Sequence, residues 1–174
     1  ILNSWTVRDG LPDLDVRGVS RTPDGYLWIA GVTGLGRFDG VRFTEIPESE
    51  LKPNGATAVL TAQDGTLWVG LDRGGLARMH AGRFQVEIPP PDESNRFILS
   101  LAEDAGGAIW AGFSKGGHVL RWQKGRFDSF SPGEWNNPVS LCTATNGVLW
   151  FASYERCGFF NGREFQFLPQ SEKG

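Results

Sequence analysis

The chain has 174 residues, enough for one domain with a substantial hydrophobic core. Its 24 glycines, 10 prolines, 7 tryptophans and 12 phenylalanines indicate a packed protein rich in turns, and they exclude collagen, a coiled coil and an acidic tail. The formal net charge of −3, with no long run of one sign, excludes the basic footprint of a nucleic-acid-binding protein.

The sequence contains no apolar stretch near the roughly 18 residues of a membrane span, so we expect no direct membrane insertion by this chain. It opens with Ile1, and its only methionine is Met79. We therefore expect the chain to be processed or excised from a longer protein, with any signal peptide or anchor outside it.

Residues 1–10 are predicted to contribute one outer strand, Ser4–Val7. Trp5 lies 23 residues before Trp28, and the same distance separates Phe127, in a later predicted outer strand, from Trp150. By this equivalence, Ser4–Val7 belongs to a sheet that is otherwise absent from the chain.

Four tryptophans then recur at a nearly constant spacing. Each has Leu or Ile directly before it, glycine three residues before it and a small residue two residues after it. A period of about 40–45 residues is typical of a four-stranded β-propeller blade. The tryptophans, separated by 40, 42 and 40 residues, are Trp28, Trp68, Trp110 and Trp150, and we expect them to pack in the core.

Turn residues divide each repeat into four strands. Asp24-Gly25 and its counterparts lie between two apolar runs and predict a two-residue hairpin, since such turns need positive φ. A looser connection leads to the third strand, and a second glycine turn leads to the fourth. The predicted third strands are Leu35–Phe38, Leu76–Met79, His118–Trp122 and Cys157–Phe160, and the fourth are Arg42–Ile46, Arg83–Ile88, Arg126–Phe130 and Glu164–Leu168.

The predicted fold class is all-β: a β-propeller fragment of four four-stranded antiparallel blades plus the extra N-terminal outer strand, with essentially no helix. Complete propellers typically have about 4–8 blades, so the chain is expected to form part of a larger ring. The predicted blades cover residues 11–50, 51–93, 94–134 and 135–174.

The repeats resemble two-component regulator propeller repeats. The stretches that carry the resemblance are Gly10-Leu11-Pro12, Thr22–Ala30, Gly34–Phe43, Gln63–Gly70 and Glu103–Trp110. The fourth repeat departs most from the family pattern, because Glu155–Gly158 stand where a Gly-Leu pair is expected. The resemblance implies a periplasmic sensor region of a bacterial hybrid histidine kinase or diguanylate cyclase. It also implies that the output domain and the membrane anchor lie outside this chain.

Several motifs that could indicate catalysis fit the repeat better. Residues 112–116 match the G-x-S-x-G nucleophile elbow, but they form a predicted strand-to-strand connection rather than a strand-to-helix turn. His80 and His118 have no recognisable partner pattern, and Asp13 and Asp15 read as solvated turn residues. We therefore expect no catalytic triad, no metal site and no cofactor.

Arginine recurs at one third-strand position, as Arg37, Arg78 and Arg121. This repetition predicts solvated strand faces with snorkelling side-chain stems, because a ligand site breaks the symmetry of a repeat whereas scaffold residues obey it.

The two cysteines, Cys142 and Cys157, fall on the predicted first and third strands of one blade. With a strand between them, their Cα atoms should lie about 9–10 Å apart, beyond the roughly 7 Å limit for a disulfide. We therefore expect two buried free thiols.

Ligand residues are expected in the irregular loops after the second and fourth strands of each blade, which crowd one face of a propeller. Mixed charged, amide and aromatic side chains from several blades suit a small polar ligand such as a glycan fragment or a peptide, although solvated loop charges are the alternative interpretation. The candidates are Asp72, Arg73, Lys115, Trp135, Asn136, Asn137, Tyr154, Glu155 and Arg156.

Two function classes follow from this reading. The first is a non-catalytic ligand-sensing or interaction region of a signalling protein. The second is an enzyme-like propeller, a lyase or glycan-active protein, which would need a histidine–acid pair on the same face; Glu155 with the distant His118 is its candidate. Uncovered apolar faces on the first and last blades further predict self-association, as a two-fold dimer.

Overall fold

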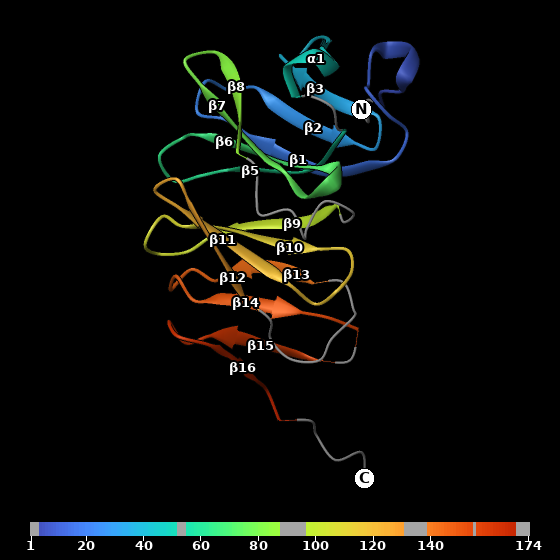
Figure 1. The fold of residues 1–174 in the computed structure, drawn as a ribbon. Coiled ribbons are helices and arrows are strands. Elements are labelled where there is room, and N and C mark those ends of the chain that lie inside the picture. Colours follow the sequence, from blue (N-terminus) through green and yellow to red (C-terminus); the bar gives the residue numbers. More distant parts are fainter. Residues whose placement is uncertain (1–3, 52–54, 88–96, 131–138, 155, 170–174) are drawn as a thin grey trace. The chain divides into compact units, whose positions relative to one another are not determined.

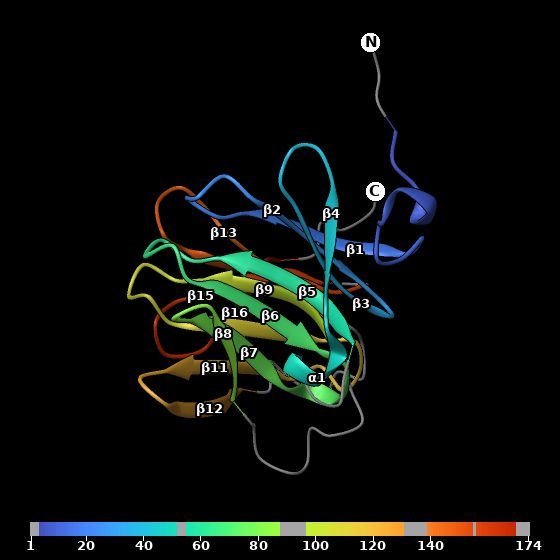
Figure 2. The same ribbon diagram turned by 90° about the horizontal axis from the view of Figure 1, so that it is seen from above.

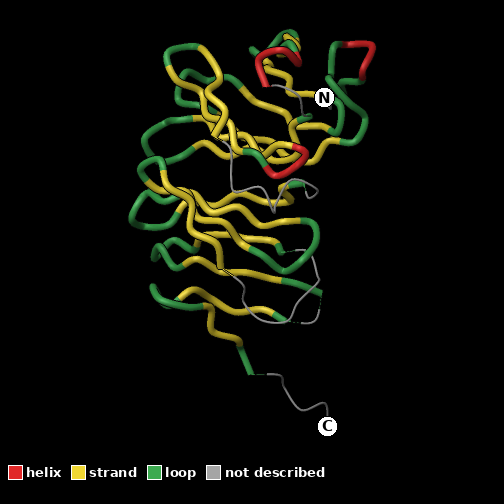
Figure 3. The backbone as a smooth tube through the Cα atoms, viewed as in Figure 1, coloured by secondary structure: helices red, strands yellow, loops and turns green. Residues whose placement is uncertain are grey.

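The computed structural model describes residues 4–51, 55–87, 97–130, 139–154 and 156–169 (Figure 1). Their regular secondary structure is almost entirely β-strand, joined by turns and loops, as the colouring in Figure 3 shows. Two compact units, residues 1–98 and 99–174, make up the chain and are described separately. No helix in the described ranges has the length and apolar character needed to cross a bilayer.

The first unit contains two antiparallel sheets, with strand orders β1-β2-β3-β4 and β5-β6-β7-β8. Figure 2 shows a single helical turn, α1 (Glu48–Leu51), where the chain passes from the first sheet to the second. The strands are β1 (Val16–Arg21), β2 (Leu27–Gly31), β3 (Gly34–Phe38), β4 (Phe43–Ile46), β5 (Ala56–Thr61), β6 (Leu67–Leu71), β7 (Leu76–His80) and β8 (Arg83–Glu87).

The second unit repeats this arrangement with the sheets β9-β10-β11-β12 and β13-β14-β15-β16. The strands are β9 (Ile98–Glu103), β10 (Ile109–Phe113), β11 (Val119–Gln123), β12 (Arg126–Phe130), β13 (Ser140–Thr143), β14 (Leu149–Ala152), β15 (Cys157–Phe160) and β16 (Phe165–Phe167). Consecutive strands pair within each of the four sheets, so the prediction of four four-stranded antiparallel units with almost no helix is confirmed.

The hairpin between the first two strands of each sheet has a three-residue loop, where the sequence predicted two residues. In the first sheet, Thr22 N–H bonds to the Tyr26 carbonyl at 3.0 Å, and Gly25 N–H bonds to the Thr22 carbonyl at 2.9 Å. Among the three loop residues, Pro23, Asp24 and Gly25, only Gly25 has positive φ, at 94°. Asp24 stays in the ordinary region and its Oδ1 accepts the N–H of Tyr26, so one glycine is sufficient for the turn.

The predicted N-terminal strand, Ser4–Val7, is wrong. Val7–Asp9 instead form a 3₁₀ turn, η1, which begins with a capping box. In this box the Thr6 side chain accepts the Arg8 N–H, and the Asp9 carboxylate accepts the Thr6 N–H at 2.7 Å. These local bonds satisfy the backbone groups that a strand would have to pair with a neighbour. Trp5 packs edge-on against Phe38, with ring centroids 5.1 Å apart.

The repeated tryptophans anchor the core of each unit. Trp28 and Trp68 are each 4% exposed, and Trp110 is fully buried. The prediction of core tryptophans is therefore confirmed for these three. Trp150 is only half-buried, because the face of the fourth sheet on which it lies has no described neighbour in its unit.

The same uncovered face corrects the prediction for the cysteines. Both thiols are free, as predicted, but Cys142 and Cys157 are exposed rather than buried. They lie on β13 and β15, with β14 between them, so the strand order that separates them is confirmed. Cys142 pairs across β13 and β14 with Trp150, on the uncovered side of this sheet.

Candidate functional site

Asp72 and Arg73 occupy the connection between β6 and β7 and form the 3₁₀ turn η2 (Asp72–Gly74). The Asp72 N–H donates to the Gly55 carbonyl at 2.9 Å, and Asp72 Oδ1 accepts the Arg73 N–H at 3.1 Å. Arg73 has a φ of 67°, in the left-handed region, which turns both side chains out of the sheet. Both are exposed to solvent.

Three other predicted ligand residues lie in the second unit. Lys115, between β10 and β11, is exposed, and Tyr154, between β14 and β15, is 82% exposed. The guanidinium carbon of Arg156 lies 5.3 Å from the centre of the Phe167 ring, which holds that side chain against β16. Trp135, Asn136, Asn137 and Glu155 fall outside the described residues.

The structure therefore places every described candidate in a connection from second to third strand, Asp72 and Arg73 in one unit and the rest in the other. Within the second unit, Lys115 and Tyr154 occupy equivalent connections of two neighbouring sheets. The connection in the first unit carries an acid and a guanidinium group, and those in the second unit carry an ammonium group, a guanidinium group and a phenol. These groups can bind a polar molecule, and the described residues among them form no acid–base pair.

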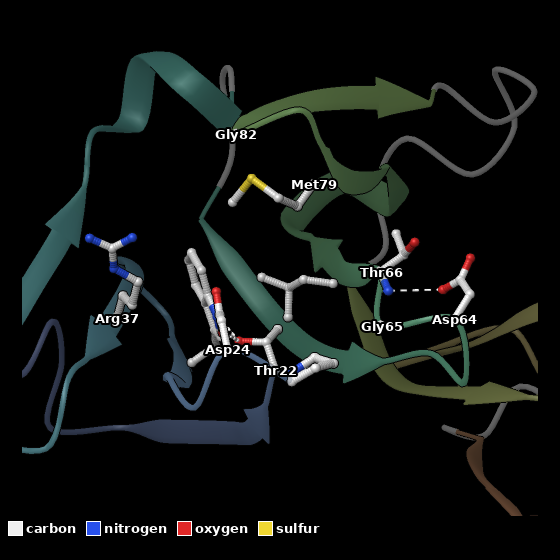
Figure 4. A pocket seen from close by; sticks show the side chains of 11 residues that line it. Thr22, Asp24, Arg37, Asp64, Gly65, Thr66, Met79 and Gly82 are labelled. Carbon is white, nitrogen blue, oxygen red and sulfur yellow. Dashed lines mark hydrogen bonds between the residues drawn. The ribbon is translucent and has the colours of Figure 1, made fainter.

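A pocket of about 470 Å³, for which the sequence carried no recognisable signal, lies at the other end of the strands, between the two sheets of the first unit (Figure 4). The first sheet contributes its β1–β2 turn, Trp28 and Arg37, and the second contributes its β5–β6 turn, Met79 and Gly82. A smaller pocket of about 300 Å³ occupies the equivalent position in the second unit, with Asp104, Arg121 and Asn146 among its lining residues.

The recurring arginines are not simply solvated, which corrects the prediction made for them. Arg37, Arg78 and Arg121 are partly buried, and each lies across from a core tryptophan in the strand register. Their guanidinium carbons lie 5.9, 6.0 and 5.6 Å from the rings of Trp28, Trp68 and Trp110 respectively. This distance is within the range of a cation–π contact.

Asp13 and Asp15 do not form a catalytic carboxylate pair. The Asp13 carboxylate accepts the N–H groups of Asp15 at 3.0 Å and Thr33 at 2.8 Å, and also the Thr33 hydroxyl. These backbone hydrogen bonds stabilise the ionised form and lower the pKa of Asp13 below 3.8. Asp15 forms an ion pair with Arg17 at 3.2 Å. Both carboxylates therefore stabilise loops.

Neither histidine has an acid partner among the described residues. His80 is exposed at the end of β7, and the half-buried His118 has no hydrogen-bond partner at Nδ1 among the described residues. Ser114, the serine of the G-x-S-x-G match, lies in the connection from β10 to β11, between two strands. The part of the chain that the structure describes also contains no group of three potential metal ligands.

Four antiparallel four-stranded sheets joined in this order define the class of the protein: it has a β-propeller-type fold, as predicted. No family model and no curated protein matches the chain. Solved structures do match, and they include extracellular domains of two-component systems, the group to which the resemblance of the repeats pointed.

Two of these neighbours are extracellular domains of hybrid two-component systems from B. thetaiotaomicron. For BT4673 the TM-score is 0.74 at 22% identity, over 92% of this chain and 23% of that one. For BT3049 the TM-score is 0.75 at 20% identity, over 94% and 24%. The virginiamycin B lyase of Staphylococcus aureus gives a TM-score of 0.77 at 15% identity, over 91% and 57%. The chain thus spans less than two thirds of each.

Proposed function

We propose that this chain is the ligand-sensing or interaction propeller region of a bacterial extracytoplasmic sensor and that it is not itself catalytic. The observation that carries the proposal is the likeness to the extracellular domains of two hybrid two-component systems, which extends over more than nine tenths of this chain. The resemblance of the repeats to two-component regulator propeller repeats supports it independently. A periplasmic location follows from the same proposal.

The proposed binding residues belong to second-to-third-strand connections of each unit and, in the sequence, to the loop before the fourth sheet. Exposed Arg73, Lys115 and Tyr154 are not needed for packing, which supports a role in recognition. A planar phenol can stack on an apolar ligand face, while ammonium and guanidinium groups bind hydroxyl or carboxylate oxygens. The full proposed set is Asp72, Arg73, Lys115, Trp135, Asn136, Tyr154, Glu155 and Arg156. The proposed ligand is a glycan fragment or a peptide.

Arrays of glycan fragments and short peptides provide the test, with calorimetric titration of every hit. We expect Lys115→Ala and Tyr154→Ala each to weaken binding by about tenfold or more, as loss of a charged or aromatic contact does. Arg126→Ala is the matched control, because Arg126 is also exposed in the second unit but starts β12, at a different connection. Equal weakening by Lys115→Ala and Arg126→Ala would contradict this binding face.

An enzyme-like propeller with a site on the same loops is the second candidate, and the likeness to virginiamycin B lyase favours it. A solved form of that lyase contains quinupristin, so quinupristin is the first substrate to test. Turnover seen by mass spectrometry and abolished by His118→Ala, but not by His80→Ala, would establish an enzyme. Binding of an array ligand without turnover supports the sensor.

A further inference from the structure

Arg37 differs from the two repeat-equivalent arginines because none of the described residues accepts a hydrogen bond from it. Arg78 Nη2 donates to Gln85 Oε1 and forms an ion pair with Glu87, both at 3.2 Å. Arg121 Nη2 donates to Gln123 Oε1 at 2.7 Å, and its Nε lies 4.0 Å from Asp104. Among the described residues, Arg37 makes no hydrogen bond and no ion pair.

The strand register explains this difference. Arg78 pairs with Gln85 across β7 and β8, whereas Arg37 pairs with Thr44 across β3 and β4. The Thr44 side chain is too short to accept a hydrogen bond from the Arg37 guanidinium group. Glu45, the acid next to Thr44, pairs with Gly36 and therefore points to the opposite face of the sheet.

The Arg37 side chain is nevertheless held in place. Its guanidinium carbon lies 4.4 Å from the centre of the Tyr26 ring and 5.9 Å from that of Trp28. Stacking of this kind occupies the face of the guanidinium and leaves its in-plane N–H donors free. Tyr26 is itself specific to the first repeat, since the equivalent positions are Thr66, Ala108 and Val148. The asymmetry expected of a ligand site is therefore present.

The pocket that Arg37 lines also contains acceptors and an apolar surface. Asp24 and Asp64 each use Oδ1 to accept a backbone N–H of their own turn, from Tyr26 and from Thr66. Their second carboxylate oxygens have no hydrogen-bond partner among the described residues. Figure 4 shows Arg37 on the first-sheet side and Asp64 on the second-sheet side, with Met79 between them.

We propose that this pocket binds a small organic carboxylate that also carries a hydrogen-bond donor, namely an α-amino or α-hydroxy acid with an apolar side chain. Arg37 binds the carboxylate with two parallel N–H donors, and the free oxygen of Asp24, which lies in a turn of the same sheet, accepts from the amino or hydroxyl group. Half-buried Met79 covers the apolar side chain of the ligand. The pocket volume of about 470 Å³ is within the range of small-molecule sites, about 300–1,000 Å³.

The site is separate from the loop face proposed above, because it lies at the turns between first and second strands. The equivalent pocket of the second unit serves as an internal control. Its arginine, Arg121, already has an amide and a carboxylate partner, so it has less capacity for a ligand carboxylate.

Titration of the isotope-labelled chain with L-leucine, with its α-hydroxy analogue and with leucinol, which lacks the carboxylate, provides the test by NMR. We expect saturable shifts with at least one of the two acids and none with leucinol. Arg37→Gln should weaken that binding by about 10- to 100-fold, the effect of losing hydrogen bonds to a charged group. Arg121→Gln is the matched control and should leave it unchanged.

The variant Asp24→Asn distinguishes the two acids and gives a second test if Arg37→Gln does not fold. Asparagine keeps the Oδ1 acceptor of the turn but removes the charge, so binding of leucine should weaken and binding of the hydroxy acid should persist or strengthen. Asp64→Asn, in the equivalent turn of the second sheet, is the matched control and should leave both unchanged. Absence of saturable binding by either acid at millimolar concentration would overturn the proposal. Equal weakening by Arg37→Gln and Arg121→Gln would also overturn it.

Discussion

Replacing Trp110 with alanine should destabilise the second unit far more than replacing its repeat equivalent, Trp150. Trp110 is fully buried, and its ring centroid lies 4.7 Å from Phe160 and 5.1 Å from Phe130. Its Nε1–H also donates to Asp104 Oδ2 at 2.7 Å. Truncation of a buried tryptophan costs about 3–5 kcal/mol, and loss of the hydrogen bond to a carboxylate adds about 1 kcal/mol or more.

Trp150 provides the comparison because it has the same position in the repeat but is only half-buried, with Phe159 as its ring neighbour at 5.5 Å. Its truncation should cost about 1–2 kcal/mol. With a urea m-value of about 2 kcal/mol per molar, the unfolding midpoint should fall by about 2–3 M for Trp110→Ala and by no more than about 1 M for Trp150→Ala. Circular dichroism measures both midpoints. A fall as large for Trp150→Ala as for Trp110→Ala would refute the reasoning.

Three further predictions follow from the structure. The folded-state pKa of Asp13 is lowered, so the ionised carboxylate stabilises the folded protein above pH 3.8, and this stabilisation is lost as the pH falls through the folded pKa. Asp13→Asn should therefore lower the urea midpoint at neutral pH. The difference between the variant and the original chain should vanish in strong acid. Cys142 and Cys157 are exposed, so native protein should titrate two thiols per chain with a chromogenic thiol reagent, and a count of none would contradict the structure. We expect the chain to dimerise, because apolar side chains are exposed on the first sheet (Val19 at 59%) and Trp150 on the fourth sheet is only half-buried. Light scattering that shows a monomer of 19.1 kDa at micromolar concentrations would contradict this prediction.

The sequence determined the four sheets because the signals for them are local. The spacing of the tryptophans and the glycines at the turns specify short antiparallel strands between neighbours in the chain, and antiparallel hairpins need no long-range information. The N-terminal segment shows the limit of such reasoning. Trp5 matched the repeat spacing, but the capping box of Thr6 and Asp9 offered a local alternative that the spacing argument did not include.

Only the tertiary structure decided which equivalent positions are buried. Trp110 and Trp150 share the same local sequence pattern, yet only Trp110 has a described neighbouring sheet in its unit that covers it, and the same difference exposes Cys142. Burial depends on what packs against a strand, and the strand's own sequence does not contain that partner. The pocket beside Arg37 arises in the same way, because two turns that are distant in sequence meet there and the register places Thr44 where the next sheet has Gln85.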